Sequence, residues 1–208
     1  FGMIPILEPS NQQEAYDMVH YAFDISEKYA VPTLMRITTR LAHSRSGVKL
    51  KGGVRKQNEL KLPTDLRQFV LLPAIAKKNY RRLLSIQDSL ELEAEKSGFN
   101  KYIDGNDKSL GIITCGIAYN YLMENYPQGV PHPVLKIGQH PIPQKMVKKL
   151  YDECDAILVL EEGYPIIEEL LKGMLNLGKT IKGRLDGTVP RDGELNPTIV
   201  AKAMGLNV

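Results

Sequence analysis

The chain has 208 residues, a net charge of +3 and a hydrophobic content of 43%. Its length allows one large domain or two modest ones, and its composition is that of an ordinary globular protein. The weak net charge, without a compact basic patch interleaved with aromatic residues, argues against nucleic-acid binding. No apolar run reaches the roughly 18 residues that would span a bilayer, so we expect no membrane segment.

The cysteines and histidines suggest no metal site. Cys115 and Cys154 lie in apolar stretches, and we predict that both are reduced core residues of a cytoplasmic protein. Neither cysteine has a nearby partner, and no two histidines have ligand spacing on one helix. The chain lacks an initiator methionine and begins within residues of a strand-like run. We therefore expect it to be an internal fragment of a longer polypeptide.

The first 38 residues predict a strand, a helix and a second strand. Residues 3–7 form a short apolar run. Ser10, with Gln13 three residues later, has the pattern of a capping box, and apolar residues at helical spacing continue to about residue 29. Residues 31–38 form the second strand. A two-stranded sheet of this kind is too small to be stable alone.

Four polar residues follow the end of that second strand, namely Thr38, Thr39, Arg40 and His43. Ligands of open parallel sheets bind at the carboxyl ends of the strands, so this loop is a candidate site. A solvated polar loop is the alternative interpretation.

The middle of the chain predicts a connector and a helix. Residues 47–72 are basic, contain Gly52-Gly53 and show no periodicity, which is typical of an exposed crossover. Residues 73–98 have helical spacing, with Gly98 as the C-cap. Residues 99–107 have the composition of a polar, turn-rich link.

The remaining segment has the pattern of a parallel sheet with flanking helices. Apolar runs at 110–116, 134–138 and 156–163 alternate with amphipathic stretches at 117–126 and 143–154. A helix over 165–177 capped by Gly178, a polar edge strand over 180–187 and a short helix from Asn196 complete this module. The sequence thus predicts an α/β fold with an open, mainly parallel sheet.

Two places at the strand ends could bind ligands or partners. Gly116 would expose the following helix N-terminus as a weak anion site. His140, Glu161, Glu162 and Tyr164 follow neighbouring strands and should cluster at one sheet edge, as part of a site or a subunit interface. The alternative is that the glutamates are helix-entry acids favoured by the helix dipole. No phosphate-binding loop and no catalytic constellation complete in itself is present.

Four stretches carry a family resemblance: Ile-Pro-Ile-Leu-Glu-Pro-Ser-Asn-Gln-Gln-Glu at 4–14, Thr-Thr-Arg-Leu-Ala-His-Ser at 38–44, Gly-Ile-Ile-Thr-Cys-Gly at 111–116 and Val-Leu-Glu-Glu-Gly at 159–163. With them, nearly the whole chain resembles the α subunit of indolepyruvate:ferredoxin oxidoreductases. The resemblance implies a thiamine-diphosphate-dependent enzyme that decarboxylates arylpyruvates oxidatively to aryl-acetyl-CoA and passes the electrons to ferredoxin. It also implies a β subunit as partner, coenzyme A as co-substrate, and Mg²⁺ and 4Fe-4S clusters in the full enzyme.

The resemblance divides the chain into three parts. Residues 1–46 resemble the end of a pyrimidine-binding domain, residues 47–107 are a connector with a long helix, and residues 108–208 resemble a transketolase-C-terminal-like domain. The family's Gly-Asp-Gly…Asn motif for Mg²⁺ and diphosphate is absent, as is its Cys-x-x-Cys-x-x-Cys cluster motif. The glutamate that activates thiamine is expected upstream of Phe1. We therefore expect that this chain alone binds no cofactor and is inactive.

The resemblance also assigns a role to the polar loop. Thr38, Thr39, Arg40 and His43 would line the substrate or cofactor side of the assembled site, with Arg40 paired to a carboxylate. Relatives specific for pyruvate or 2-oxoglutarate remain open. A different class of function is also open, in which the chain is a stand-alone doubly wound module that binds an anionic ligand or mediates oligomerisation.

Overall fold

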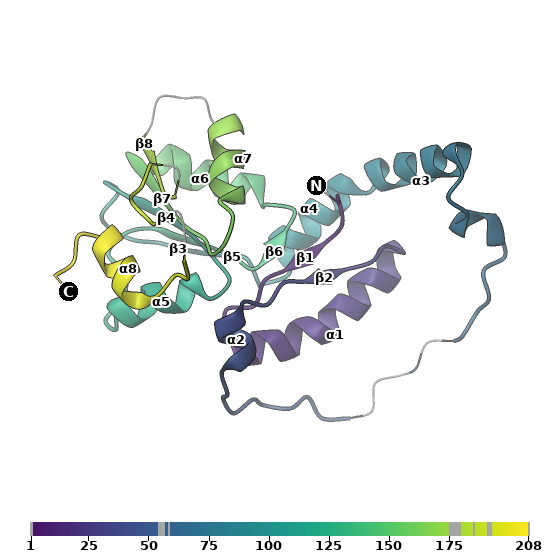
Figure 1. The fold of residues 1–208 in the computed structure, drawn as a ribbon, viewed down its shortest axis with the longest axis horizontal. Helices are drawn as coiled ribbons and strands as arrows, with labels where there is room; N and C mark the ends of the chain where they lie inside the picture. Colours follow the sequence, from purple (N-terminus) through teal and green to yellow (C-terminus); the bar gives the residue numbers. More distant parts are fainter. Residues whose placement is uncertain are drawn as a thin grey trace.

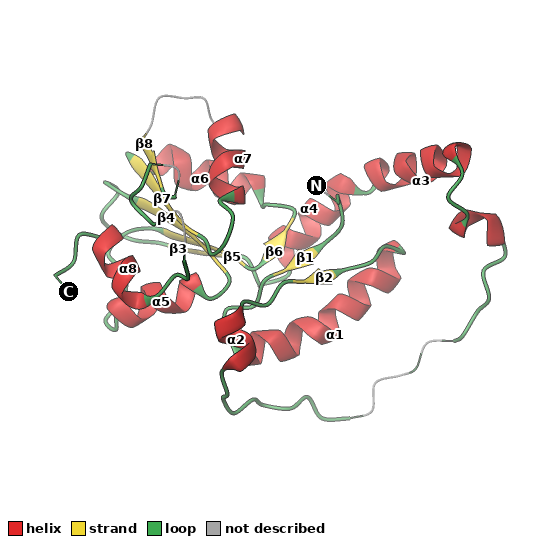
Figure 2. Ribbon diagram, viewed as in Figure 1, coloured by secondary structure: helices red, strands yellow, loops and turns green. Residues whose placement is uncertain are grey.

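The structure is a computed structural model that describes residues 2–53, 57, 59–174, 180–184, 186–190 and 193–207. Two sheets lie side by side, and helices flank both of them (Figures 1 and 2). The predicted α/β fold with an open, mainly parallel sheet is confirmed. Among the helices of the described residues, none is long and apolar enough to cross a membrane.

The larger sheet has the strand order β3-β5-β4-β7-β8. Its strands are β3 (Lys101–Ile103), β4 (Gly111–Cys115), β5 (Val134–Ile137), β7 (Ala156–Leu160) and β8 (Thr180–Lys182). All neighbours are parallel except β3, which is antiparallel to β5. The central strands are apolar on both sides because both faces of this sheet are covered.

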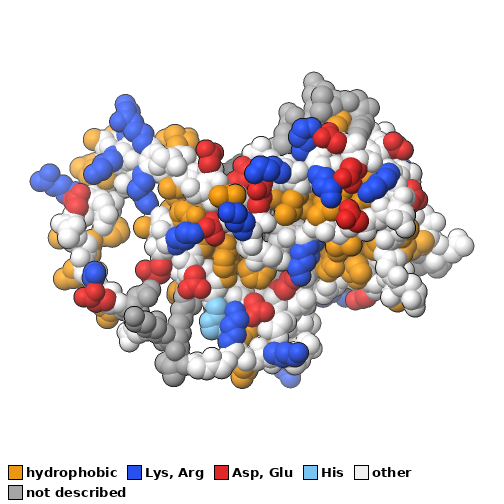
Figure 3. Space-filling model, turned by 180° about the vertical axis from the view of Figure 1, so that it is seen from behind, with side chains coloured by type: hydrophobic (Ala, Val, Ile, Leu, Met, Phe, Trp, Pro, Cys, Tyr) orange, Lys and Arg blue, Asp and Glu red, His pale blue; other side chains and the backbone are white. Residues whose placement is uncertain are grey.

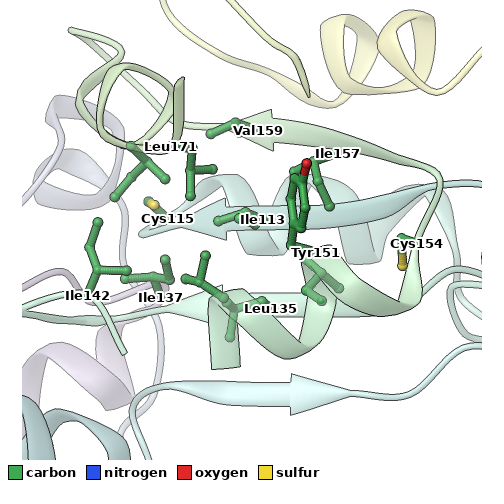
Figure 4. Close-up of a cluster of buried hydrophobic side chains, with 13 residues drawn as sticks. Ile113, Cys115, Leu135, Ile137, Ile142, Tyr151, Cys154, Ile157, Val159 and Leu171 are labelled. Atoms are coloured by element: carbon green, nitrogen blue, oxygen red, sulfur yellow. The ribbon is translucent and has the colours of Figure 1, made fainter. Parts of the chain in front are cut away.

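Two separate cores lie on the two faces of this sheet. The flanking helices are α5 (Ala118–Asn125), α6 (Gln144–Glu153), α7 (Ile166–Met174) and α8 (Pro197–Ala203). Ile113 and Val159 point to the core that α6 and α7 cover (Figure 4). Their neighbours Ile112 and Leu158 point to the core under α5 and α8. The alternation follows from the two-residue period of a strand and produces a doubly wound module.

The N-terminal residues form a smaller unit joined to the larger one. It contains β1 (Ile6–Leu7), α1 (Gln12–Tyr29), β2 (Leu34–Met35) and α2 (Thr39–His43). Strand β1 pairs in parallel with β2 and antiparallel with β6 (Gln139–His140), which directly follows β5. The predicted two-stranded sheet thus gains its third strand from the C-terminal half of the chain.

The segment between the two units differs from the prediction. It contains the 3₁₀ turn η1 (Leu66–Phe69) and two helices, α3 (Pro73–Ser85) and α4 (Gln87–Lys96), where one helix was predicted. The helix is interrupted at Ile86, where ψ is −2°. Helix α4 packs Leu90 and Ala94 into the protein, whereas α3 buries no side chain. The predicted turn-rich link after α4 also contains β3, an edge strand with a polar sequence.

Local details at the start of the chain also differ. The N-cap of α1 is Asn11, whose side chain accepts a hydrogen bond from the Glu14 amide at 2.8 Å, so the prediction of Ser10 with Gln13 is wrong by one position. Glu14 in turn accepts hydrogen bonds from the Ser10 amide and hydroxyl. The polar loop after β2 is the short helix α2, because the Thr38 side chain caps it.

The C-terminal elements agree with the prediction more closely. Helix α8 begins after Asn196, whose side chain accepts from the Ile199 amide as predicted. Strand β8 ends at Lys182, earlier than predicted, since the Asp186 carboxylate accepts a hydrogen bond from the Gly183 amide and closes a turn there. The predicted cap Gly178 lies outside the described residues.

A buried ion pair links α1 to the larger sheet. Lys136 on β5 is almost fully buried, and its ammonium group contacts the Glu14 carboxylate. The ammonium also lies 4.9 Å from the ring centre of Tyr119. Burial alone would raise the pKa of Glu14, but Lys136 and Ser10 hold that pKa below its usual value. A lysine in the interior of a strand requires this carboxylate, because an unpaired buried charge is costly.

The ion pair leads to a stability prediction. Glu14→Gln leaves the Lys136 ammonium buried without a charged partner. We therefore expect the free energy of unfolding, measured with urea at neutral pH, to fall by about 3 kcal/mol or more. The double variant Glu14→Gln/Lys136→Met should lose less unfolding free energy than the sum of the losses in the two single variants. Because the pKa of Glu14 is lowered on folding, its stabilisation is present above pH 4.5 and is lost as the pH falls through the folded pKa. Additive single-variant losses would contradict this account.

Candidate functional site

A crevice opens between β4 and β7 at their carboxyl ends. The chain leaves β4 at Cys115 toward α5 on one face, and it leaves β7 at Leu160 toward α7 on the opposite face. In open α/β sheets, ligands bind at such a point, where the loops after neighbouring strands diverge. The fold therefore directs attention to the residues that surround this crevice.

The N-terminal unit fills the crevice with Glu8. This residue directly follows β1 and is almost fully buried. Its Oε2 lies close to Gly116, since a Cβ atom added to that glycine would be 3.6 Å away from it. Gly116 has a φ of +53°, in the left-handed region that favours glycine. The predicted weak anion site beyond Gly116 is thus next to a carboxylate of the protein itself.

Arg36 connects three strand ends around Glu8. Its Nη1 donates to Glu8 Oε2 at 3.2 Å, and its Nη2 donates to the Glu162 carbonyl oxygen at 2.5 Å. His140 Nε2 lies 3.6 Å from Glu8 Oε1. Burial alone would raise the pKa of the Glu8 carboxyl, but His140 and Arg36 hold it below its usual value. Arg36 therefore joins the end of β2 to the ends of β1 and β7.

Glu161 caps the first turn of α7. Its carboxylate accepts hydrogen bonds from the amides of Ile167 at 2.9 Å and Glu168 at 3.0 Å. Burial raises the pKa of this carboxyl, although the two amides act in the opposite direction. This geometry is the helix-entry arrangement that the sequence left open as the alternative.

The next two candidate residues lie at the mouth of the crevice. Glu162 Oε2 is buried and accepts no hydrogen bond from the described residues. Burial, and then the nearby Glu194, raise the pKa of Glu162. Tyr164 is exposed and donates to Glu169 at 2.7 Å.

All four residues predicted to cluster line one cavity of about 130 Å³. The lining is Glu8, Arg36, Cys115, His140, Glu161, Glu162, Tyr164, Ile166 and Ile167. Sequence reasoning missed Glu8 and Arg36. The signal for Glu8 was its position directly after the first predicted strand, at the same kind of strand end as Glu161.

The predicted polar loop lies beside this cavity as a rim formed by α2. The Thr39, Arg40 and His43 side chains line an open groove of about 370 Å³ with Ser44 and Glu194, whereas Thr38 instead caps α2. Arg40 lies 3.4 Å from Glu194 and over the ring of Tyr121 at 5.8 Å. Glu194 was also missed, because it lies far away in the sequence and only the fold brings it to Arg40.

The rim can bind an anion more readily than the crevice can. Arg40 and Glu194 are both about half exposed, and an exposed ion pair at 3.4 Å contributes little to stability. The guanidinium can therefore exchange Glu194 for the carboxylate of a ligand. The crevice instead contains three glutamates. In the described part of the chain, no group of three or more His, Cys, Asp or Glu could hold a metal ion.

Comparison with known proteins found relatives in sequence and a separate solved structure with a similar fold. The indolepyruvate oxidoreductase subunit IorA of Methanothermobacter thermautotrophicus is 35% identical over 207 residues, which cover 97% of this chain and 34% of that protein. IorA of Pyrococcus abyssi is 35% identical over 223 residues, covering 99% of this chain and 34% of that protein. The chain thus spans about a third of the length of these relatives. No protein-family model matches the chain.

Among solved structures, the 2-oxoglutarate:ferredoxin oxidoreductase from Magnetococcus marinus is similar, with a TM-score of 0.60 at 12% identity. The similarity covers 97% of this chain and 41% of that one, and it concerns the fold alone. The sequence resemblance to the α subunit of indolepyruvate oxidoreductases is confirmed for the part of that subunit that the chain spans.

The Glu8 network leads to a second prediction. Glu8→Gln removes the charge that Arg36 and His140 face, so we expect about 1–3 kcal/mol lower stability at neutral pH. Because the pKa of Glu8 is lowered on folding, the difference should shrink as the pH falls through that pKa. Urea unfolding at several pH values measures it, with the exposed Glu124→Gln as the control. A loss that does not depend on pH would contradict the assignment.

Proposed function

We propose that the chain is part of the α subunit of an indolepyruvate:ferredoxin oxidoreductase. The full enzyme would decarboxylate arylpyruvates oxidatively, form the aryl-acetyl-CoA and pass the electrons to ferredoxin, with a β subunit, in the cytoplasm. The observation that supports this proposal most strongly is the 35% identity to IorA over 97% of the chain. Pyruvate or 2-oxoglutarate as the preferred substrate remains an alternative within the same reaction class.

The cofactors of such an enzyme, thiamine diphosphate with Mg²⁺ and 4Fe-4S clusters, do not fit the residues of this chain. The chain has no Gly-Asp-Gly…Asn motif and only two cysteines. Cys115 is the last residue of β4. Cys154, which follows α6, lies beside Gly111 at the opposite end of that strand (Figure 4). Two buried thiols so placed cannot bind one cluster. We therefore propose that other parts of the enzyme hold the cofactors and that this chain alone is inactive.

The proposed division of the chain keeps residues 1–46 as the end of a pyrimidine-binding domain and 108–208 as a transketolase-C-terminal-like domain. Residues 47–107 connect them. Strand β6 lies within the second part and pairs with β1 of the first, so the two parts share a sheet. This shared sheet would hold α2 in a defined place relative to the larger sheet.

Within the proposed enzyme, the rim would face the substrate. Arg40 would bind the carboxylate of the 2-oxoacid through its planar guanidinium group, and Thr39 and His43 would line the same groove. Thr38 would act through its cap on α2, which holds Arg40 in position. Glu194, which faces Arg40 in this structure, would give way to the substrate carboxylate.

The alternative of a stand-alone module that binds an anion at the sheet is less well supported. The point where a doubly wound sheet normally binds its ligand is filled by Glu8 and surrounded by Glu161 and Glu162. Three carboxylates there would repel an anionic ligand.

Arg40 provides the test of the proposed substrate contact. In the full-length enzyme with its partner subunit, Arg40→Glu should raise KM for the arylpyruvate at least about tenfold, because a charge-assisted hydrogen bond to the carboxylate becomes a repulsion. The KM of the Arg40→Lys variant should lie between the values for the wild-type enzyme and for Arg40→Glu. Arg45→Glu, also exposed and next to the rim, is the matched control. Unchanged KM and kcat in Arg40→Glu would refute the assignment.

The activity itself is tested on the same complex. Indolepyruvate, coenzyme A and oxidised ferredoxin should yield the aryl-acetyl-CoA and reduced ferredoxin, with pyruvate and 2-oxoglutarate as competing substrates. If none of these three 2-oxoacids supports the reduction of ferredoxin, the proposal is overturned.

A further inference from the structure

A buried hydroxyl group without a partner lies beside the rim. Tyr121 on α5 is only 3% exposed, and its hydroxyl has no hydrogen-bond partner among the described residues. Buried hydroxyl groups in native structures are almost always paired, so this one indicates a partner that the described residues do not supply. On the face shown in Figure 3, acidic and basic side chains are interspersed over the body of the protein, so surface charge singles out no comparable place there.

The charged groups around Tyr121 show which way its hydroxyl faces. The Cζ atom of Arg40 lies 5.8 Å from the centre of the Tyr121 ring. Burial has the largest effect and raises the pKa of the Tyr121 hydroxyl; beyond burial, Arg40 lowers this pKa, and Glu162 and Glu194 raise it. The hydroxyl is therefore within electrostatic reach of the charged side chains where the rim meets the crevice.

A second buried polar atom without a partner lies at the same boundary. Glu162 Oε2 accepts no hydrogen bond from the described part of the chain. Burial raises the pKa of Glu162 most, and Glu194 raises it further while Arg40 lowers it, as these two residues also do for Tyr121. Two unpaired groups that share their charged neighbours indicate a place for a polar molecule.

The cavities beside Arg40 provide room for such a molecule. Arg40 and Ser44 line the rim groove, and both also line a second cavity of about 240 Å³ to which Asn120 and Tyr121 contribute from α5. The two cavities are therefore neighbours, with the Arg40 side chain between them. Because Arg40 and Glu194 are both about half exposed and weakly paired, a ligand can replace Glu194 without displacing a packed side chain.

We propose that the Tyr121 hydroxyl donates a hydrogen bond to the 2-oxo oxygen of the acid whose carboxylate Arg40 binds. The inference rests on the proposed function, since it requires a 2-oxoacid at the rim. The two carboxylate oxygens match the fork of a guanidinium group. The neighbouring oxo oxygen carries no proton and needs a further donor, which a neutral hydroxyl can be. Tyr121 thereby distinguishes 2-oxoacids from acids that lack the oxo group.

Tyr121→Phe tests this assignment in the full-length enzyme with its partner subunit. Loss of one neutral hydrogen bond should lower kcat/KM for indolepyruvate at least about fivefold. Indole-3-propionate has the carboxylate but no 2-oxo group, so its inhibition constant should stay within about twofold of the wild-type value. Tyr126→Phe, at the C-cap of the same helix, is the matched control and should change neither quantity.

Thermal unfolding of the same complexes separates this role from a structural one. Because the Tyr121 hydroxyl is unpaired in the described residues, its removal should leave the unfolding midpoint unchanged or raise it. A lower midpoint in Tyr121→Phe would show that the hydroxyl supports the fold instead, and it would overturn the proposal.

The kinetic outcomes also separate this inference from the proposed function. An unchanged kcat/KM for indolepyruvate in Tyr121→Phe, as expected if only water pairs with the hydroxyl, overturns the inference alone. Equal weakening of indole-3-propionate inhibition also overturns it, because the hydroxyl would then serve the carboxylate. If the wild-type complex reduces ferredoxin with no 2-oxoacid, the proposed function fails, and this inference fails with it.

Discussion

The position of Glu8 is the constraint on which the arrangement of the two sheets depends. Glu8 directly follows β1, and its carboxylate lies in the crevice between β4 and β7, where it contacts Arg36 and His140. The Glu8 amide donates to the Gly138 carbonyl at 2.8 Å, so the same residue also joins β1 to the segment that forms β6. Because a buried carboxylate must keep its partners, neither sheet can shift without exposing an unpaired charge.

This closure determines what the rim can do. Arg36 fixes the end of β2, and α2 begins three residues later, so the Arg40 guanidinium lies over the ring of Tyr121 on α5. The crevice that would bind a ligand in a free-standing doubly wound domain is instead used for assembly. In the proposed enzyme, this chain would therefore position and recognise the substrate, while the cofactor chemistry would belong to other parts of the protein.

Much of the larger sheet could be predicted because its strands are apolar on both faces and its helices repeat every 3.6 residues. The predictions failed where a distant contact decides the structure. The interruption at Ile86 has no glycine or proline to signal it, and Lys101-Tyr102-Ile103 becomes a strand only beside β5. At the site, the cluster around Glu161 followed from strand order. The roles of Glu8 and Arg36 required knowing that the two sheets meet.

The most direct test of this account is amide hydrogen exchange of the chain under native conditions. If Glu8 joins the two sheets into one cooperative unit, the Glu8 and Arg36 amides, which donate to the carbonyls of Gly138 and Leu7, should exchange with the same opening free energy as Ile112 in β4. Exchange of these two amides by local opening, several kcal/mol below the value for Ile112, would contradict the account.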